Sequence, residues 1–372
     1  MITIKEVSTK KDLKTFIKFP FTLYKNSPYW VPPIIKDEKA IFDKEKNPVF
    51  KDAEAHLFLA YKNNEVVGRI AAIINWLEVR TLNKKKLRFG WYDVIDDLEV
   101  SKALFEKVTQ IGRDKGLEFM DGPVGFSNMD KAGMLIMGFD RINNMTTLYN
   151  HPYYLEHMDA MDFKHGMQWK EYEIDVPKTV PEKVKKFAKL VLERYQLKLL
   201  SFKSTNEMVH YADDMFDLMN RSFKDLQSFV PIQQYQVDMY REKYLKFLHP
   251  DYITLIQDKE QKLVGFSVTM PSFARALQKA NGKLFPLGFY HLLRAKNKNK
   301  FGNLFLIGVD PEYQGKGLTA VIFQKVIENY NKRGITLVET NPELEENQSV
   351  QAMWKNYDPR LIKRWRTYTK KL

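Results

Sequence analysis

The sequence contains no cysteine among its 372 residues. This absence excludes disulfides, thiolate nucleophiles and zinc–thiolate sites, and it is compatible with a reducing compartment. No apolar run reaches the roughly 18 residues that span a bilayer. The first residues, Met1 to Lys5, show no basic segment followed by an apolar stretch, as a secretory signal would. The sequence therefore predicts a cytoplasmic protein without a transmembrane segment.

Histidine is also scarce, with seven in the chain. His151, His157 and His165 lie near two aspartates, but separations of six and eight residues do not place two ligands on one face of a helix. We therefore expect no metal site.

Positive charge is plentiful, because 59 Lys and Arg residues against 46 Asp and Glu residues give a formal net charge of +13. Such a surface attracts phosphorylated cofactors, RNA or anionic lipid, although a lysine-rich solvated surface has the same composition. The basic runs 84–86 and 296–300 are expected at loop tips. Neither has the interleaved aromatic residues that stack on single strands, so RNA is not favoured as a partner.

The chain contains an internal repeat, because short sequence segments recur in the same order. Trp30 to Pro32 recurs as Phe229 to Pro231 at an offset of 199, and Trp169 to Tyr172 recurs as Trp365 to Tyr368 at an offset of 196. A helical segment ending at Gly116 recurs at an offset of 218, which requires an insertion in the second copy. With Val67 and Gly68 recurring as Val264 and Gly265, and Asp162 as Asp358, the five ordered matches favour a duplication over chance.

Each copy predicts the same order of elements: strand, helix, several strands, helix, strand, helix, strand. Serine or threonine follows the first strand as a helix N-cap, and Gly116 and Gly334 stand where C-cap glycines belong. The predicted fold class is therefore α/β with a mixed sheet, in two tandem domains. Their expected bounds are residues 1–176 and 197–372, joined by a linker helix at 177–196.

A glycine-bearing turn in the second copy carries the main chemical signal. The strand 304–309 ends before Asp310, and the run Gln314 to Gly317 opens a helix. Free N–H groups and the positive end of a helix dipole hold phosphate oxygens, and glycine lets the backbone approach them closely. The turn matches neither GxxxxGK[ST] nor GxGxxG. From the residues alone, a phosphate cradle and a plain strand-to-helix turn both fit.

The run from Ile307 to Thr319 resembles the coenzyme A-binding motif of the GNAT superfamily of N-acyltransferases, Gln/Arg-x-x-Gly-x-Gly/Ala, with Thr319 in the last Gly/Ala position. The element order and the repeat are similar to those of tandem GNAT proteins. The resemblance implies two acyl-CoA N-acyltransferase-like domains, with acetyl-CoA or another acyl-CoA as the co-substrate. The cofactor-binding residues that it implies are Ile307, Gly308, Val309, Gln314, Gly315, Lys316, Gly317, Leu318 and Thr319.

The stretch Asn347 to Lys355 resembles the family's Asn-x-x-Ala-x-x-Leu-Tyr helix, in which the tyrosine is thought to protonate the leaving thiolate. Trp354 stands in its place, and an indole cannot serve as that acid. Tyr357, one turn later, is the candidate substitute.

The resemblance also implies direct attack of an amine on an acyl thioester, which needs a proton acceptor. Glu339, at the end of the fifth strand, is the first candidate, and a solvated strand-end carboxylate is the alternative. Asn341 and Asn347 are expected to bind the substrate. Three further carboxylates, Glu343, Glu345 and Glu346, either attract a cationic acceptor or charge the first turn of the next helix favourably.

The first copy lacks the motif. At the offset of 218, the acidic run Asp96 to Glu99 aligns with Gln314 to Gly317, and its carboxylates would repel a pyrophosphate. We therefore expect the first copy to bind no cofactor, and either to support the second domain or to lend residues to an acceptor site between the two. An insertion at 122–149 is expected to form an ordered loop near the junction. A second insertion, 271–300, reads as a packed helix pair, or else as a lid over an acyl chain or a contact with anionic lipid.

The sequence thus predicts an N-acyltransferase, most simply an N-acetyltransferase, that moves an acyl group from acyl-CoA to a small-molecule amine. Two alternatives stay open: an aminoacyl-tRNA-dependent transferase, and a non-catalytic ligand-binding protein with tandem GNAT-like domains.

Overall fold

The computed structural model describes the chain except residues 128, 227–228, 244–247, 348–350, 352 and 355–356. Its framework is one mixed sheet in the strand order β1-β2-β3-β4-β5-β14-β7-β12-β11-β10-β9-β8, while β13 pairs with β7 and β6 with β14. The strands are Ile2–Glu6 (β1), Ala53–Lys62 (β2), Glu65–Asn75 (β3), Lys86–Val94 (β4), Phe119–Gly122 (β5), Met134–Met137 (β6), Lys164–Asp175 (β7), Lys198–Leu199 (β8), Ile253–Gln257 (β9), Leu263–Pro271 (β10), Phe301–Val309 (β11), Leu337–Thr340 (β12), Glu343–Leu344 (β13) and Arg360–Lys371 (β14).

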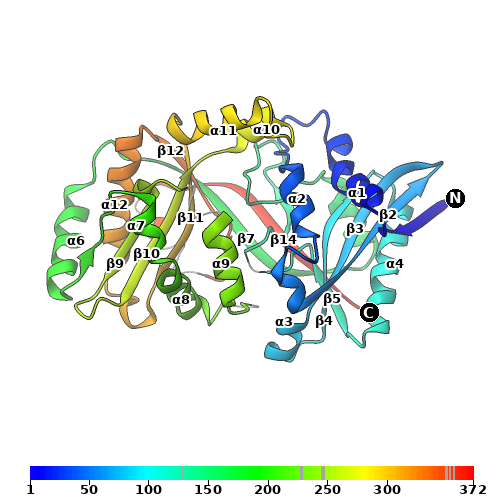
Figure 1. The fold of residues 1–372 in the computed structure, drawn as a ribbon, viewed down its shortest axis with the longest axis horizontal. Helices are drawn as coiled ribbons and strands as arrows, with labels where there is room; N and C mark the ends of the chain where they lie inside the picture. Colours follow the sequence, from blue (N-terminus) through cyan, green and yellow to red (C-terminus); the bar gives the residue numbers. More distant parts are fainter. Residues whose placement is uncertain (128, 227–228, 244–247, 348–350, 352, 355–356) are drawn as a thin grey trace.

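Helices cover both faces of this sheet in each half of the molecule, and the two halves lie side by side along its long axis (Figure 1). The α-helices are Lys10–Leu23 (α1), Ile35–Ile41 (α2), Trp76–Leu82 (α3), Leu98–Asp114 (α4), Tyr153–Ala160 (α5), Glu182–Arg194 (α6), Thr205–Val209 (α7), Ala212–Phe223 (α8), Gln234–Lys243 (α9), Ala274–Ala280 (α10), Gly288–Asn297 (α11) and Leu318–Arg333 (α12). Short 3-10 helices occupy Pro48–Lys51 (η1), Pro250–Tyr252 (η3) and Pro311–Tyr313 (η4). No helix in the described ranges is long and apolar enough to cross a membrane.

The alternation of side chains along β3 explains how one strand supports two helices. Ile70 and Ala72 point to the core beneath α4, whereas Ala71 and Ile73 point to the core beneath α1. The second half repeats this arrangement, with α12 and α6 packed on one face and α8 on the other. The predicted linker helix is therefore α6, and it is also part of the second core.

The helix ends lie where the sequence predicts them. Thr9 accepts a hydrogen bond from the Asp12 amide at 3.1 Å, and Ser204 accepts one from the Glu207 amide at 3.3 Å, so the two copies cap their first helices in the same way. Gly334 ends α12 with φ of +72°, a conformation that favours glycine.

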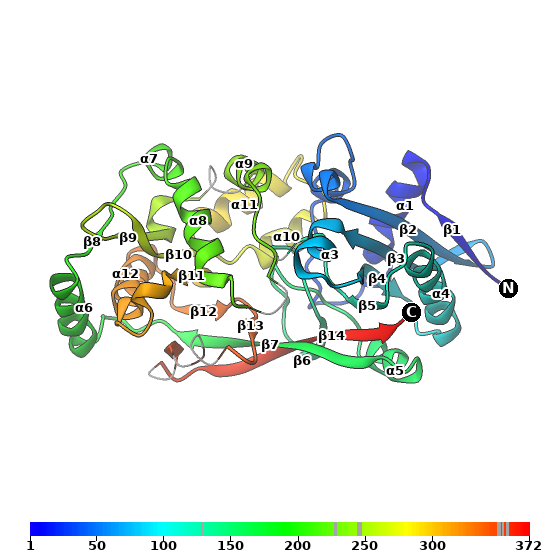
Figure 2. The same cartoon turned by 90° about the horizontal axis from the view of Figure 1, so that it is seen from below.

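The two halves exchange their last strands (Figure 2). β14, at the end of the chain, pairs with β5 of the first half, whereas β7, which ends the first copy, pairs with β12 of the second. β7 and β14 also pair with each other, and Trp169 lies opposite its repeat partner Trp365. The pseudo-two-fold axis of the duplication therefore passes between these tryptophans. The predicted domain bounds follow the chain, but each half of the sheet is completed by a strand from across that boundary.

Candidate active site

A cavity of about 300 Å³ lies between the two halves, where β11 and β12 separate. These strands pair in parallel only from Phe301 opposite Leu337 to Leu304 opposite Thr340. The Asn341 amide then donates to the Leu304 carbonyl at 2.8 Å, after which β13 pairs with β7, and β11 continues to Val309 paired with β10 only. The divergence of two parallel strands thus opens a gap in the middle of the sheet.

Both halves line this cavity, and they contribute different chemistry. The second half supplies mainly apolar walls from β11, α12 and the segment after α8, including Leu306, Ile322, Phe323, Phe223 and Phe229. The first half supplies a polar end that includes Lys86, Arg88, Asp121, Ser127 and Asp130. The predicted junction loop 122–149 therefore does reach the cavity. Among the described residues, no cluster of three or more His, Cys, Asp or Glu side chains could hold a metal ion.

The basic run 84–86 is expected at a loop tip, but Lys86 does not lie there. It begins β4 with 4% of its side chain exposed, and its Nζ lies 2.6 Å from Oε1 of the buried Glu78. Arg88, two residues along the same face of the strand, donates from Nε to Oε2 of Glu78 at 2.8 Å. The basic run extends into the start of β4, so Lys86 is buried, and the Glu78 carboxylate on α3 pairs with its charge.

Glu343, on β13, is a largely buried ionisable group that lines the cavity. Its Oε1 accepts a hydrogen bond from Nε1 of Trp354 at 2.5 Å, while Oε2 is buried and accepts none from the described residues. Burial raises the pKa of Glu343 to about 8, although the hydrogen bond from Trp354 and the nearby Thr340 hydroxyl oppose the shift. A carboxyl group that titrates near neutral pH, lines the cavity and has one oxygen without a hydrogen-bond partner among the described residues can accept a proton from a nucleophile.

Trp354 therefore has a role that its place in the motif did not reveal. The indole is 4% exposed, packs edge-on against Phe323 with ring centroids 4.9 Å apart, and donates its N–H to Glu343. An indole N–H is a donor only, so it orients the carboxylate. The sequence names Glu343 as one of three nearby carboxylates. Its pairing with Trp354 depends on β13, which the sequence pattern does not show.

The two catalytic candidates from the sequence lie elsewhere. Glu339 is not among the residues that line the cavity, and its Oε2 lies 3.6 Å from Nζ of Lys363, which also contacts the buried Glu171 at 3.2 Å. Glu339 points away from the cavity because consecutive strand residues face opposite sides, and it is Thr340 that lines the cavity. Tyr357 is half-buried beside Phe323, with ring centroids 5.9 Å apart, and does not line the cavity.

The two substrate candidates do line the cavity. Oδ1 of Asn341 accepts a hydrogen bond from Thr146 of the first half at 2.9 Å, which ties the end of β12 to the junction loop. Asn347 lines the cavity too, and its amide donates to the Leu344 carbonyl at 2.9 Å. Most of the helix predicted after Asn347 lies outside the described residues.

The glycine-bearing turn joins β11 to α12 in a conformation suited to anions. Gly315 and Gly317 have φ of +72° and +87°, and α12 begins directly after Gly317 with no side-chain cap from any described residue. Its first amides and the positive end of its dipole are therefore available to a ligand. Lys316 adds a cation beside them, with Nζ 5.0 Å from the ring centroid of Tyr313. These features fit a diphosphate.

The strand that leads into this turn offers further backbone groups. The Val309 carbonyl accepts from Oγ of Ser222 at 3.1 Å and from Nε2 of Gln314 at 3.2 Å, while Ile307 lines the cavity. The Asp310 amide donates to the Val264 carbonyl of β10 at 2.9 Å. Because amides along an antiparallel strand alternate in direction, the preceding Val309 amide points away from β10 and towards the gap.

The same place in the first half is filled by the protein itself. Asp97 caps α4 by accepting from the Glu99 amide at 3.1 Å, and its other oxygen lies 2.6 Å from Nζ of Lys62. On β4, the Val94 amide donates to the Tyr154 hydroxyl at 2.9 Å. Both the helix end and the strand edge are thus occupied by side chains.

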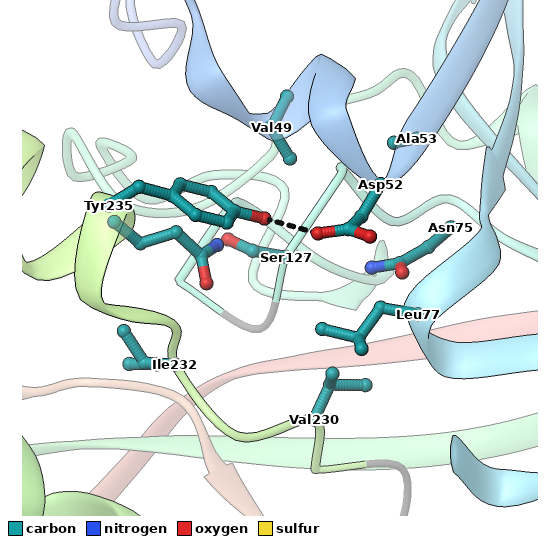
Figure 3. A pocket seen from close by; sticks show the side chains of 10 residues that line it. Val49, Asp52, Ala53, Asn75, Leu77, Ser127, Val230, Ile232 and Tyr235 are labelled. Atoms are coloured by element: carbon teal, nitrogen blue, oxygen red, sulfur yellow. Dashed lines mark hydrogen bonds between the residues drawn. The ribbon is translucent and has the colours of Figure 1, made fainter. Parts of the chain in front are cut away.

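A second, much smaller cavity of about 20 Å³ lies between η1 of the first half and α9 of the second (Figure 3). The Tyr235 hydroxyl donates to Oδ2 of Asp52 across it at 3.3 Å. This space can hold one water molecule, so it belongs to the junction of the halves rather than to a substrate site.

Comparison with known proteins agrees with this architecture. Residues 212–357 match the family model described as Acetyltransferase (GNAT) family. The chain is 27% identical to protein YghO of Escherichia coli (98% of this chain, 94% of that protein) and 25% identical to a protein named bacterial ceramide synthase of Caulobacter vibrioides (100% and 98%). A solved tandem GNAT protein from the clavulanic acid biosynthesis pathway superposes with a TM-score of 0.60 at 12% identity, over 100% of this chain and 98% of that one. This likeness confirms the predicted fold class.

Proposed function

Because the chain has the tandem GNAT fold with a GNAT family domain in its second half, we propose that it is an acyl-CoA-dependent N-acyltransferase with one active site. The observation that carries the proposal is the contrast at one place in the fold. In the second half, an open gap with the buried Glu343 carboxyl lies beside an uncapped helix, while in the first half Asp97 and Tyr154 fill the corresponding positions.

The turn and the gap would hold the acyl donor. The amides that begin α12, together with Lys316, would bind the diphosphate, and the gap between β11 and β12 would take the pantetheine arm. When bound, acyl-CoA supplies an activated acyl thioester. The Val309 amide, which faces the gap, is placed to donate to the thioester carbonyl oxygen as negative charge develops there.

Glu343 would then accept the proton of the attacking amine, directly or through a water molecule. Its pKa of about 8 makes the carboxylate a sufficiently strong base near neutral pH, and Trp354 fixes its orientation. The amine nitrogen forms the new amide bond, the C–S bond of the thioester breaks, and coenzyme A leaves as a thiol or thiolate.

The cavity also suggests the kind of acceptor. Its walls are largely apolar and its far end, with Lys86 and Arg88, is polar, as an amphipathic amine requires. A full-length relative bears the name bacterial ceramide synthase, and a ceramide is the amide of a fatty acid with a long-chain amino alcohol. We propose that the acceptor is a long-chain amine and the donor a fatty acyl-CoA, in place of the acetyl-CoA that is the simplest expectation for the family.

The test is a product assay with purified protein, acyl-CoA of increasing chain length and a long-chain amino alcohol, followed by mass spectrometry. The expected product is the N-acyl amide, formed with release of one free thiol for each amide bond, and lost in Glu343→Gln. Amide formation on short polyamines but not on the long-chain amine would contradict the acceptor class. Absence of thiol release with every acyl-CoA and amine would contradict the enzyme assignment.

A further inference from the structure

The hairpin of α10 and α11, residues 272–300, gathers exposed apolar side chains to an unusual degree. Of the ten large hydrophobic residues that the described chain exposes most, five lie in this hairpin and a sixth, Phe301, directly follows it. They are Phe285, Leu287, Phe289, Tyr290, Leu293 and Phe301, with exposures from 41% to 77%. Apolar groups gathered in this way mark an interaction surface, whereas scattered single ones do not.

The same hairpin is basic throughout. Residues 272–300 contain no Asp or Glu, and they contain seven Lys or Arg residues: Arg275, Lys279, Lys283, Arg294, Lys296, Lys298 and Lys300. None of the seven forms a salt bridge with a described residue. All are exposed except Lys296, which is half-buried. Their positive charge is therefore available to a partner.

The base of the hairpin is firmly attached to the first half, so the exposed tip is a fixed feature of the fold. Nε2 of Gln278 donates to the carbonyls of Pro28 and Trp30 at 2.8 and 3.0 Å, and the Ile35 amide donates to the Gly282 carbonyl at 3.0 Å. Ala274, Leu277 and Ala280 pack against Val31, Ile34 and Met145. Figure 1 shows α10 and α11 along one edge of the molecule, over the junction of the halves.

We infer that this hairpin docks on the surface of an anionic lipid bilayer. Phe285, Leu287 and Phe289 would enter the boundary between headgroups and acyl chains, and the surrounding lysines and arginines would contact lipid phosphates. An anionic bilayer binds segments of this composition, in which apolar residues at the tip are surrounded by basic residues without acidic ones. The inference stands on the hairpin alone and does not require the proposed acyl transfer.

Other occupants fit the hairpin less well. A symmetric contact between two copies of the chain would place the same basic patch against itself, with no acidic partner in the hairpin. A nucleic acid would use the aromatic rings but would leave the aliphatic side chains of Leu287 and Leu293 without a partner. A bilayer accommodates aromatic, aliphatic and basic groups together.

The hairpin also lies close to the cavity. Met145 packs against the base of the hairpin, and the next residue, Thr146, lines the cavity. Consecutive residues of the junction loop thus pack against the base of the hairpin and form part of one wall of the site. If the proposed long-chain acceptor is correct, docking would bring the enzyme to the membrane that contains it.

The experiment is flotation of the full chain with vesicles of phosphatidylcholine, alone or mixed with phosphatidylglycerol. We expect binding to the mixed vesicles, weakened by salt, and little binding to the neutral ones. Phe285→Ser with Phe289→Ser, and separately Lys296→Glu with Lys298→Glu, should weaken the partition about tenfold or more. Leu361→Ser, and Lys10→Glu with Lys11→Glu, alter exposed residues of the same types elsewhere and should bind like the wild type.

A second readout uses the absence of cysteine, because one introduced thiol can be labelled cleanly. A polarity-sensitive fluorophore on Leu287→Cys should shift to the blue with mixed vesicles, and the same label on Lys10→Cys should not. Three results would each overturn the inference: wild type that floats with neither vesicle, hairpin variants that float like wild type, or a hairpin-dependent complex with tRNA or a second copy in place of vesicle binding. Vesicle binding is scored without substrate, so failure of acyl transfer would leave it untouched.

Discussion

The two halves of the chain share a framework and differ where a strand meets the helix that follows it. In the first half α4 begins with Asp97, whose carboxylate caps the helix, whereas in the second half α12 begins after Gly317 with no side-chain cap from the described chain. A carboxylate at that position provides a negatively charged acceptor for the free amides of the helix, as a bound phosphate would. The comparison teaches that a few side chains at a helix end can close a ligand site while the fold persists.

The two halves also differ at the strand edge next to this helix start. The gap after Thr340 is open, and the corresponding strand edge at Val94 is held by Tyr153 and Tyr154. The first half nevertheless contributes Lys86, Arg88 and Asp121 to the shared cavity. On this account the second half holds the acyl donor, and the first half forms one end of the acceptor site.

The largest expected effect comes from making the second half resemble the first. Gly317→Glu places a carboxylate at the uncapped end of α12, where it would repel a diphosphate, and acyl-CoA affinity should fall about 100-fold or more by calorimetry. Gly317→Ala is the matched control, because its Cβ meets the same Phe187 ring at 2.7 Å without adding charge. An equal loss in both variants would show that shape rather than charge governs the site.

The next effect concerns the proton acceptor. Glu343→Gln should lower kcat about 100-fold or more, and Glu339→Gln should lower it much less, since only Glu343 lines the cavity. The active form is the carboxylate, so wild-type kcat should rise with pH through about 8, the raised pKa of this group. The rise should be absent in Glu343→Gln. A profile that keeps its rise in this variant but loses it in Glu339→Gln would instead support Glu339, the candidate predicted from sequence.

A smaller effect should follow when the carboxyl group stays and its donor is removed. Trp354→Phe deletes the N–H that stabilises the charged form of Glu343, so the pKa should rise further and the kcat profile should move to higher pH. At pH 7 the rate should fall about tenfold. A profile that moves to lower pH, or a loss equal at every pH, would contradict this positioning role.

The smallest effect on ligand binding is expected from opening the first half. Asp97→Ala removes the cap of α4 and should cost about 1 kcal/mol of unfolding free energy. Acyl-CoA affinity should stay within twofold of wild type, because the Val94 amide remains bonded to Tyr154. Calorimetry and denaturant unfolding of the same preparation measure both quantities, and a large loss of affinity would place the working site in the first half.

Much of the fold could be predicted because its signals are local. Capping residues such as Thr9 and Ser204 lie at the ends of the helices they cap, and the strand-to-helix turn at Gly315 is a continuous run of sequence. The insertion at 271–300 forms a helix pair, α10 and α11, as predicted, but α11 is not packed as expected, because Gly288 is its buried residue while Phe289, Tyr290 and Leu293 are exposed. The repeat also located Trp169 and Trp365, which the structure places opposite each other.

What could not be predicted depends on contacts between distant segments. The exchange of β7 and β14 follows from pairing across the duplication, and a repeat in sequence does not say which sheet receives its last strand. Glu343 lies on a strand of only two residues, too short to show alternation, and the motif marks its donor Trp354 only as a replacement for a tyrosine. Lys86 looked solvated because its partner Glu78 lies on a different element.

The central claim is that one diphosphate site operates in each chain, at the start of α12. Its most direct test is calorimetric titration of the wild type and Gly317→Glu with coenzyme A, which carries the diphosphate without an acyl group. The account predicts one molecule bound per wild-type chain and none bound by the variant. Two molecules per chain, or undiminished binding by Gly317→Glu, would contradict it.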